Sequence, residues 1–129
     1  MIVGIGTDLA EVSRIQRSID QFQERFLKRI YTDAERAYSF SKANAAERLA
    51  ARFAAKEAGM KAIGTGWRRG VTWKDFEVIN EPSGRPSLRL SGVANQIART
   101  LGVTRISLSL THTRELAFAV VILEADGRG

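Results

Sequence analysis

The sequence predicts an α+β domain in which helices pack against an antiparallel sheet. Strand-like apolar segments occur near both ends of the chain, segments with a helical repeat of apolar residues lie between them, and no linker or internal repeat interrupts this pattern. A chain of 129 residues has the size that forms one hydrophobic core. We therefore expect a single domain over residues 1–129.

The N-terminal part is predicted to hold one strand and two helices. Residues 2–7 form a short apolar strand, and Asp8 marks its end. From 10 to 30, apolar residues recur every three to four positions among arginines and lysines, which predicts a basic amphipathic helix. Thr32 and Glu35 have the spacing of a capping box and predict the start of a further short helix.

The middle of the chain alternates between helix and strand patterns. The segment 45–63 is rich in alanine and predicts the longest helix, which Gly64 and the residues after it end. Strands are expected near 76–80 and 87–90, joined by a turn that contains proline and glycine. A helix follows and is expected to close at Gly102.

Two strands are predicted to finish the chain. From Arg105 to Thr111 apolar and polar residues alternate, so one face of this strand should be buried and the other wetter. From Leu116 to Leu123 every residue is apolar. That pattern suits a strand covered on both faces, by helices or by another subunit.

Composition argues against several classes of protein. The longest apolar run, 116–123, is far shorter than the roughly twenty residues of a membrane-spanning helix, and the N-terminus has no signal-peptide pattern. The absence of cysteine excludes disulfides and thiolate metal sites and fits a cytoplasmic location. With 20 basic and 14 acidic residues the net charge is +6, which should attract anionic partners.

Glu57 is a candidate functional residue because it follows Phe53 by four positions. That spacing puts a carboxylate on the apolar stripe of the longest predicted helix. A buried carboxylate needs a partner, since an unpaired charge removed from water is costly. A bound cation would be one such partner, and Lys61, four residues further on, would be another.

Asp8 also has two interpretations. It could face the same cavity as Glu57, and two carboxylates with water and phosphate oxygens would suit magnesium. An aspartate after a strand also commonly caps the next helix. Sequence spacing does not choose between these roles, because Asp8 and Glu57 are far apart in the chain.

Two polar turns are weaker candidates. His112 is the only histidine and lies at the expected turn between the last two strands, where its imidazole could donate to a phosphate or be an ordinary surface group. The segment from Gly64 to Gly66 could let backbone amides approach a phosphate, or could serve only to end the helix.

Four segments stand out when taken in order: Gly4 to Asp8, Arg52 to Ala58, Lys61 to Gly66 and Ser109 to Thr113. Together they resemble the holo-[acyl-carrier-protein] synthase family, the short and trimeric type of 4′-phosphopantetheinyl transferase, and the resemblance extends from Met1 to about Glu124. It implies the fold of that family. It also implies transfer of 4′-phosphopantetheine from coenzyme A to a serine of an apo acyl carrier protein, in support of fatty acid biosynthesis.

By this resemblance Asp8 and Glu57 bind magnesium together with the pyrophosphate of coenzyme A. The ion would offset the charge that develops as the carrier serine attacks the β-phosphate and adenosine 3′,5′-bisphosphate leaves. The resemblance leaves the base open among Glu57 acting through a metal-bound water, Asp8 and Lys61, and we favour the water. Lys61 shares a helical face with Glu57 and is expected to donate to phosphate.

Further contacts to coenzyme A are expected from several segments. Arg52 and Lys56 form the neighbouring stripe of the longest helix and are candidates to grip the nucleotide. The resemblance adds coenzyme contacts at Gly64, Thr65, Gly66, Arg85, Pro86, Thr111 and His112.

The resemblance also implies two protein partners. Carrier proteins of this pathway are acidic on their recognition helix, which would explain the basic helix near the N-terminus. Arg14 matches the family most directly, and the other candidates are Arg17, Arg25, Lys28 and Arg29. The family assembles as homotrimers with sites between subunits, so we expect Asp8 and Glu57 to lie near the turn of a neighbouring chain.

Two alternatives belong to other classes. The net charge, the arginine-rich helix, Trp67 and Trp73 could describe a small nucleic-acid-binding domain, but that hypothesis gives no purpose to Glu57 or the glycine motifs. A carrier-binding scaffold would keep the basic helix and show no transfer. We expect neither nucleic acid nor a membrane as a partner.

Overall fold

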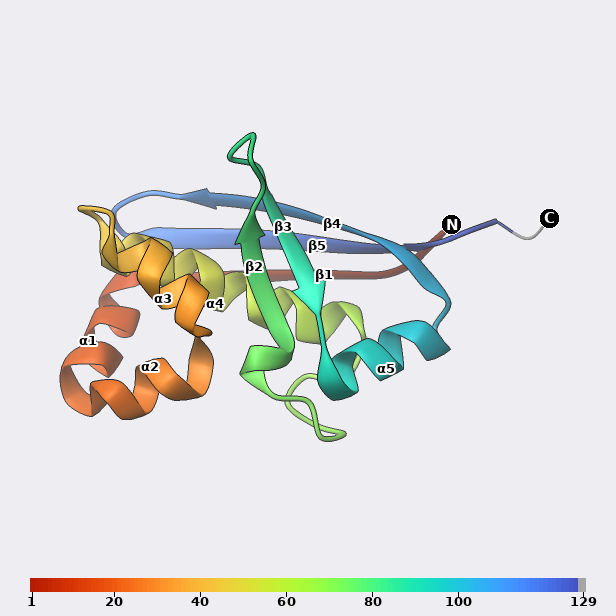
Figure 1. The fold of residues 1–129 in the computed structure, drawn as a ribbon, viewed down its shortest axis with the longest axis horizontal. Helices are drawn as coiled ribbons and strands as arrows, with labels where there is room; N and C mark the ends of the chain where they lie inside the picture. Colours follow the sequence, from red (N-terminus) through yellow and green to blue (C-terminus); the bar gives the residue numbers. More distant parts are fainter. Residues whose placement is uncertain (128–129) are drawn as a thin grey trace.

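The computed structural model describes residues 1–127, which form two antiparallel sheets and a set of helices (Figure 1). The larger sheet has the strand order β1–β5–β4, and the smaller sheet is the hairpin β2–β3. The strands are β1 (Ile2–Glu11), β2 (Phe76–Asn80), β3 (Pro86–Leu90), β4 (Val103–His112) and β5 (Leu116–Ala125). The predicted α+β class is confirmed, although the strands divide into two sheets where one was expected.

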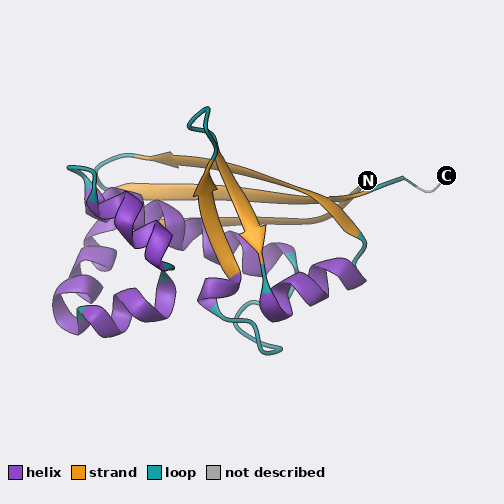
Figure 2. Ribbon diagram, viewed as in Figure 1, coloured by secondary structure: helices purple, strands orange, loops and turns teal. Residues whose placement is uncertain are grey.

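The helices surround one long central helix, α4. Figure 2 shows α4 lying along the larger sheet, with α1, α2 and α3 near one end and α5 near the other. The bounds are α1 (Val12–Phe22), α2 (Glu24–Ile30), α3 (Asp33–Phe40), α4 (Ala45–Ala62) and α5 (Gly92–Thr100), with a short 3₁₀ turn η1 (Trp73–Asp75) before β2.

Strand β1 packs directly against the backbone of α4, and two glycines make this possible. A Cβ atom at Gly6 would lie 1.9 Å from the carbonyl oxygen of Ala58, and one at Gly4 would lie 2.2 Å from that of Ala62. These distances leave no room for a side chain. Gly4 and Gly6 therefore bring β1 close enough to α4 for residues of the two elements to share a site.

Two predicted boundaries are wrong. Strand β1 continues three residues past Asp8 to Glu11, and α1 begins at the next residue. The single basic helix expected over 10–30 is two helices, because Gln23 adopts a φ of +50° and its amide closes α1 by donating to Ile19. A positive φ at a non-glycine residue interrupts a helix whatever its apolar repeat.

The predicted capping box at the start of α3 is confirmed. The Thr32 hydroxyl accepts from the Glu35 amide, and a Glu35 carboxylate oxygen accepts from the Thr32 amide at 2.9 Å. Glu35 is almost fully buried, at 1% exposure, so its carboxylate has further partners in the interior.

Strand β5 is covered on one face only. Ala117, Ala119 and Val121 are fully buried against α4, whereas Leu116 and Phe118 on the opposite face are exposed. The expectation of cover on both faces is therefore not met within one chain. In the described part of the chain, none of the helices combines the length and apolar character needed to cross a bilayer.

Candidate functional site

Asp8 lies inside strand β1 and points toward the end of α4. Its carboxylate is 3.1 Å from the ammonium of Lys61, which also donates to the carbonyl of Thr7 at 2.9 Å. The Asp8 side chain is 13% exposed, while that of Lys61 is half exposed. The capping role considered for Asp8 is excluded, because the residue at the start of α1 is Glu11 and the strand runs on past Asp8.

Glu57 lies on the least buried line of α4. Phe53 and Glu57 are half-buried and Lys61 is exposed, whereas the other residues of this helix from Leu49 to Ala62 are buried. The expectation that Glu57 interrupts an apolar stripe is therefore wrong, since this line is where α4 reaches the surface. The alternative of a Glu57–Lys61 ion pair is also not found, because the ammonium of Lys61 pairs with Asp8.

The charges of these residues are coupled. Burial raises the pKa of Glu57, the negative charge of Asp8 raises this pKa further, and the Lys61 ammonium and the Trp67 side chain oppose the rise. Asp8 pairs with Lys61, which lies one helical turn beyond Glu57, so the two carboxylates lie near each other although they come from different elements. The two negative carboxylates repel each other, and a cation bound between them would relieve this repulsion.

The donor set fits magnesium only in part. Carboxylate oxygens are the ligands that magnesium prefers, and it usually keeps several waters and substrate phosphate oxygens beside one or two carboxylates. Within residues 1–127, no group of three or more histidine and acidic side chains is placed to hold a metal. Asp8 and Glu57 would therefore supply two ligands, and a phosphorylated substrate and water would supply the rest.

The glycine turn after α4 serves first to end the helix. Gly64 and Gly66 have φ values of +83° and +56°, and the amides of residues 64–66 donate to the carbonyls of Lys61 and Met60. These amides are therefore not free to cradle a phosphate. The space where side chains of Gly64 and Gly66 would begin is open, so a ligand can approach the turn closely.

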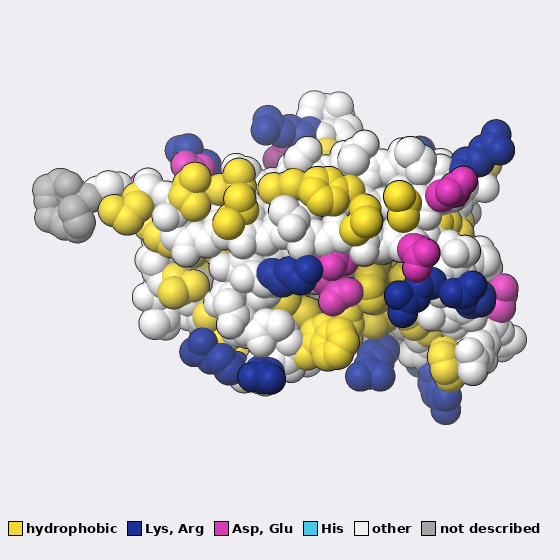
Figure 3. All heavy atoms as spheres, turned by 180° about the vertical axis from the view of Figure 1, so that it is seen from behind, with side chains coloured by type: hydrophobic (Ala, Val, Ile, Leu, Met, Phe, Trp, Pro, Cys, Tyr) yellow, Lys and Arg dark blue, Asp and Glu magenta, His cyan; other side chains and the backbone are white. Residues whose placement is uncertain are grey.

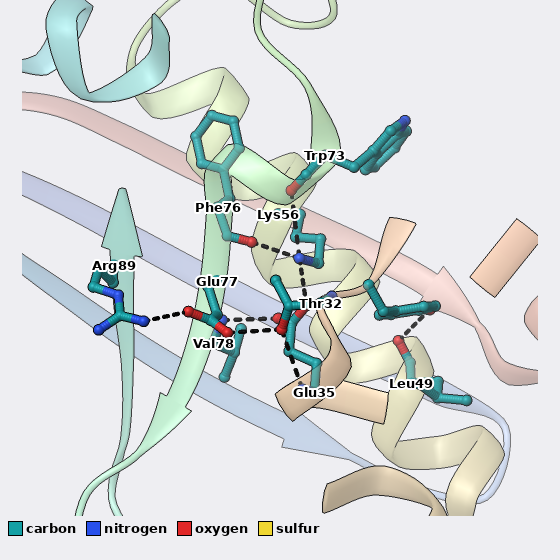
Figure 4. Close-up of polar contacts among 10 residues, drawn as sticks. Thr32, Glu35, Leu49, Lys56, Trp73, Phe76, Glu77, Val78 and Arg89 are labelled. Carbon is teal, nitrogen blue, oxygen red and sulfur yellow. Dashed lines mark hydrogen bonds and ion pairs between the residues drawn. The ribbon is translucent and has the colours of Figure 1, made fainter. Parts of the chain in front are cut away.

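The expected nucleotide contact of Lys56 is wrong. Its ammonium is fully buried and pairs with the carboxylate of Glu35 at 2.7 Å, and it also donates to the carbonyls of Phe76 and Trp73 (Figure 4). Burial lowers the pKa of Lys56, and the charge of Glu35 opposes that change. All three donors of the ammonium are occupied inside the protein.

Arg52 also points away from Asp8 and Glu57. It is 3% exposed, its guanidinium lies over the Tyr38 ring, and one of its nitrogens donates to Asn80 at 2.6 Å. Its Nε atom has no partner among the described residues. Arg52 therefore belongs to the side of α4 that faces α3 and the β2–β3 hairpin.

The other expected coenzyme contacts lie in the β2–β3 hairpin and at the end of β4, away from Asp8 and Glu57. Arg85 is exposed in the turn of the hairpin, and Pro86 begins β3. Thr111 and His112 end β4, where the His112 ring is 3.0 Å from Glu47 at the start of α4. Ten residues of α helix, about 15 Å, separate Glu47 from Glu57, so one chain does not bring His112 to the carboxylates.

The basic residues proposed for carrier recognition line up along α1 and α2. Arg14 and Arg17 are exposed on α1, and Arg25, Lys28 and Arg29 are exposed on α2. The α2 residues border a surface cavity of about 970 Å³ that lies between α2 and the segment 67–74.

Sequence reasoning missed the aromatic side of this cavity. Trp73 stacks on Phe53 with ring centroids 4.9 Å apart, and Trp67 lies 6.0 Å from Trp73. We call Phe53, Trp67 and Trp73 the aromatic wall, because all three line the cavity. Only the chain fold reveals it, since the tryptophans follow α4 in an irregular segment without a periodic pattern.

Comparison with known proteins finds one family. Residues 4–121 match the family model described as the 4′-phosphopantetheinyl transferase superfamily. A holo-[acyl-carrier-protein] synthase of Solibacter usitatus is 64% identical over 124 residues, which cover 96% of this chain and 99% of that protein.

Solved structures agree with the fold. A holo-[acyl-carrier-protein] synthase from Neisseria meningitidis has a TM-score of 0.87 at 34% identity, covering 96% of this chain and 99% of that one. The Bacillus anthracis synthase, solved in complex with coenzyme A (3′,5′-ADP), has a TM-score of 0.80 at 38% identity, covering 98% and 99%.

Proposed function

Because this chain belongs to the 4′-phosphopantetheinyl transferase superfamily, we infer that it is a holo-[acyl-carrier-protein] synthase. It transfers the 4′-phosphopantetheine group of coenzyme A to a serine of an apo acyl carrier protein. The observation that carries this function is the meeting of Asp8 and Glu57 beside Lys61, at the junction of β1 and α4.

Asp8 and Glu57 would hold magnesium on the diphosphate of coenzyme A. When bound, the ion supplies positive charge that stabilises the charge developing on the diphosphate during transfer. The mutual repulsion of the two carboxylates and the raised pKa of Glu57 support this assignment, because both indicate a site that lacks positive charge. Lys61 supplies one such charge already and is free to turn from Asp8 toward a phosphate oxygen, because its side chain is half exposed.

The bond changes follow from the substrates. The serine oxygen forms a bond to the β-phosphorus, and the bond from that phosphorus to the bridging oxygen breaks, which releases adenosine 3′,5′-bisphosphate. The serine proton passes through a water that Glu57 holds and ends on the Glu57 carboxylate. Phosphoryl transfer of this kind depends mainly on positioning and electrostatic stabilisation.

The carrier would dock on the basic surface of α1 and α2. Arg14, Arg17, Arg25, Lys28 and Arg29 are all exposed there and carry positive charge that would steer an acidic recognition helix. The position of Arg25, Lys28 and Arg29 beside the cavity supports this surface, because the cavity reaches from α2 to the aromatic wall.

The active assembly would be a homotrimer. Figure 3 shows hydrophobic side chains gathered in a band across one face of the molecule. Ile5 and Leu9 of β1 and Leu116 and Phe118 of β5 are large, exposed and apolar. Burying this face against neighbouring copies would remove it from water and would let a neighbour complete the site with its own hairpin and β4 residues.

Assembly would explain the separation of the expected coenzyme contacts. Asp8, Glu57, Lys61 and the turn from Gly64 to Gly66 lie at one end of α4, and a neighbouring copy would add the second group. That group consists of Arg85, Pro86, Thr111 and His112, whereas Arg52 is nearly fully buried in its own chain. We also propose that the enzyme acts in the cytoplasm and supplies holo carrier protein for fatty acid synthesis, since both substrates are expected there.

The function is tested by incubating the purified protein with coenzyme A, magnesium and apo carrier protein and reading the mass of the carrier. The expected result is a gain of one phosphopantetheine group. Asp8→Asn and Glu57→Gln should each slow the transfer by roughly a hundredfold or more while the circular dichroism spectrum stays unchanged. Near-normal turnover in either variant would contradict the assigned site.

The same assay separates an enzyme from a carrier-binding scaffold. A scaffold would bind the carrier and leave its mass unchanged at every magnesium concentration. Omission of magnesium, with a chelator present, is the matched control, and it should stop transfer in the unaltered protein.

A further inference from the structure

We propose that Glu35 and Lys56 are positioning residues that hold the aromatic wall beside Glu57. Neither is expected to touch a substrate, because both side chains are fully buried. This positioning role rests on the function proposed above, because it concerns how the carrier serine approaches Asp8 and Glu57.

The buried pair links four elements at one point. Glu35 of α3 accepts from the ammonium of Lys56 in α4 and from the amide of Val78 in β2 at 2.8 Å (Figure 4). The ammonium also donates to the carbonyl of Trp73, the first residue of η1, at 3.4 Å and to that of Phe76, the residue after η1, at 2.5 Å. Buried charges with every hydrogen bond satisfied fix the relative placement of the groups that satisfy them.

One of these bonds anchors the aromatic wall. The Trp73 carbonyl accepts from Lys56, and the Trp73 ring stacks on Phe53, one helical turn before Lys56. Two residues on the same side of α4 therefore hold Trp73, one through its main chain and one through its ring. Without the Lys56 ammonium, only the stacking of the Trp73 ring on Phe53 would hold η1 against α4.

The wall leads to the carboxylate site. The ring of Trp67 lies 6.0 Å from that of Trp73, and Glu57 lies one turn beyond Phe53 on α4. The opposite side of the cavity is formed by α2 with Arg25 and Lys28. The position of Trp73 thus sets the width of the cavity between the basic surface of α2 and the aromatic wall, whose Phe53 lies one helical turn before Glu57.

The variant that tests this is the double change Glu35→Gln with Lys56→Met. It removes both buried charges together, so it avoids the unpaired charge that either single change would leave. The glutamine keeps an oxygen that can accept from a backbone amide. We expect the KM for apo carrier to rise by about tenfold, with the KM for coenzyme A and kcat nearly unchanged.

Fluorescence gives a readout that does not need transfer. Trp67 and Trp73 are the only two tryptophans in the chain, so the variant Trp67→Phe leaves Trp73 as the single reporter. In that background the double change should shift the Trp73 emission to longer wavelength and increase its quenching by acrylamide. Measurements well below the melting temperature of each variant separate this effect from unfolding.

Glu77→Gln is the matched control. Glu77 accepts from Thr32 and Arg89 in the same polar network but makes no bond to the Trp73 main chain. It should leave the Trp73 emission and the carrier KM unchanged. A folded double variant with unaltered Trp73 emission and unaltered carrier KM would overturn the proposal, whereas absence of transfer in the unaltered protein would overturn the proposed function alone.

Discussion

Glu57 has two charged neighbours that act on its carboxyl group in opposite directions. Asp8 makes the charged form of Glu57 less favourable, and Lys61 makes it more favourable. The Lys61 ammonium lies against Asp8, so it neutralises part of the negative charge before any ligand arrives. A cation that binds both carboxylates would release Lys61 for a phosphate.

Substitution of these neighbours should move the pKa of Glu57 in opposite directions. Asp8→Asn removes a like charge and should lower this pKa, while Lys61→Met removes an opposite charge and should raise it further. The measurement is an NMR titration of the Glu57 side-chain carboxyl carbon without metal. A change of the Glu57 pKa in the same direction in both variants would contradict the placement of Glu57 between Asp8 and Lys61.

The pH dependence of folding follows from the same shift. Because the pKa of Glu57 is raised in the folded state, the folded chain keeps this proton to higher pH than the unfolded chain does. The contribution of this residue to stability is therefore present below its ordinary pKa and is lost as the pH rises through the raised value. Magnesium affinity should change in the opposite direction, since the ion needs the deprotonated carboxylate.

At this scale the sequence predicted some residues well and others wrongly. Asp8 and Glu57 belong to two motifs that the sequence makes recognisable, and Asp8 pairs with Lys61, one helical turn beyond Glu57. Lys56 is expected from sequence to grip the nucleotide, because it forms with Arg52 the stripe of the helix next to Glu57. Its burial could not be predicted, because it depends on Glu35, a residue of another helix that meets Lys56 only in the folded chain.

Among the elements, the contact of β1 with α4 depends on the absence of side chains at Gly4 and Gly6. Gly6→Ala should therefore lower the free energy of unfolding, by about 3 kcal/mol or more, at the upper end of the usual cost of overpacking. The reason is that its Cβ would meet the backbone oxygen of Ala58, which cannot move aside as a side chain can. Chemical denaturation measures the change.

Gly127→Ala is the matched control for this prediction. The chemical change is the same, but no atom lies within 4 Å of a Cβ at Gly127. Its free energy of unfolding should equal that of the unaltered chain. A Gly6→Ala protein with the same stability as this control would show that β1 can move away from α4 at little cost.

Local patterns predicted the elements better than their connections. The capping box at Thr32 and the alanine-rich helix α4 depend on neighbouring residues, and both were predicted correctly. The break at Gln23 carries no glycine or proline signal. The division into two sheets depends on which strands pair, and pairing is decided by contacts between residues far apart in the chain.

For the whole molecule, the trimer predicts that two inactive variants can restore each other. In the proposed assembly each site combines Glu57 of one chain with His112 of the next. Dissociating and reassociating equal amounts of Glu57→Gln and His112→Ala chains should then yield about one quarter of the sites intact, from random cyclic assembly. The measurement is the rate of carrier modification relative to the unaltered protein.

The outcome distinguishes shared sites from sites within one chain. If each site were built from a single chain, mixing would restore no activity, because every chain would carry one defect. Phe118→Glu provides an independent arm, since a charge on the exposed apolar face of β5 should prevent assembly. Light scattering should then report a monomer, and an active monomer would contradict the trimer.

Lys56 and Glu57 are consecutive residues with opposite environments, one sealed inside the protein and the other facing outward. A step of one residue rotates a helix position by about 100°. Insertion of a single residue within α4 ahead of this pair would therefore turn the lysine outward or the glutamate inward, and either result would remove the site. Insertions or deletions that preserve activity are expected instead in residues 41–44, the connection that precedes α4.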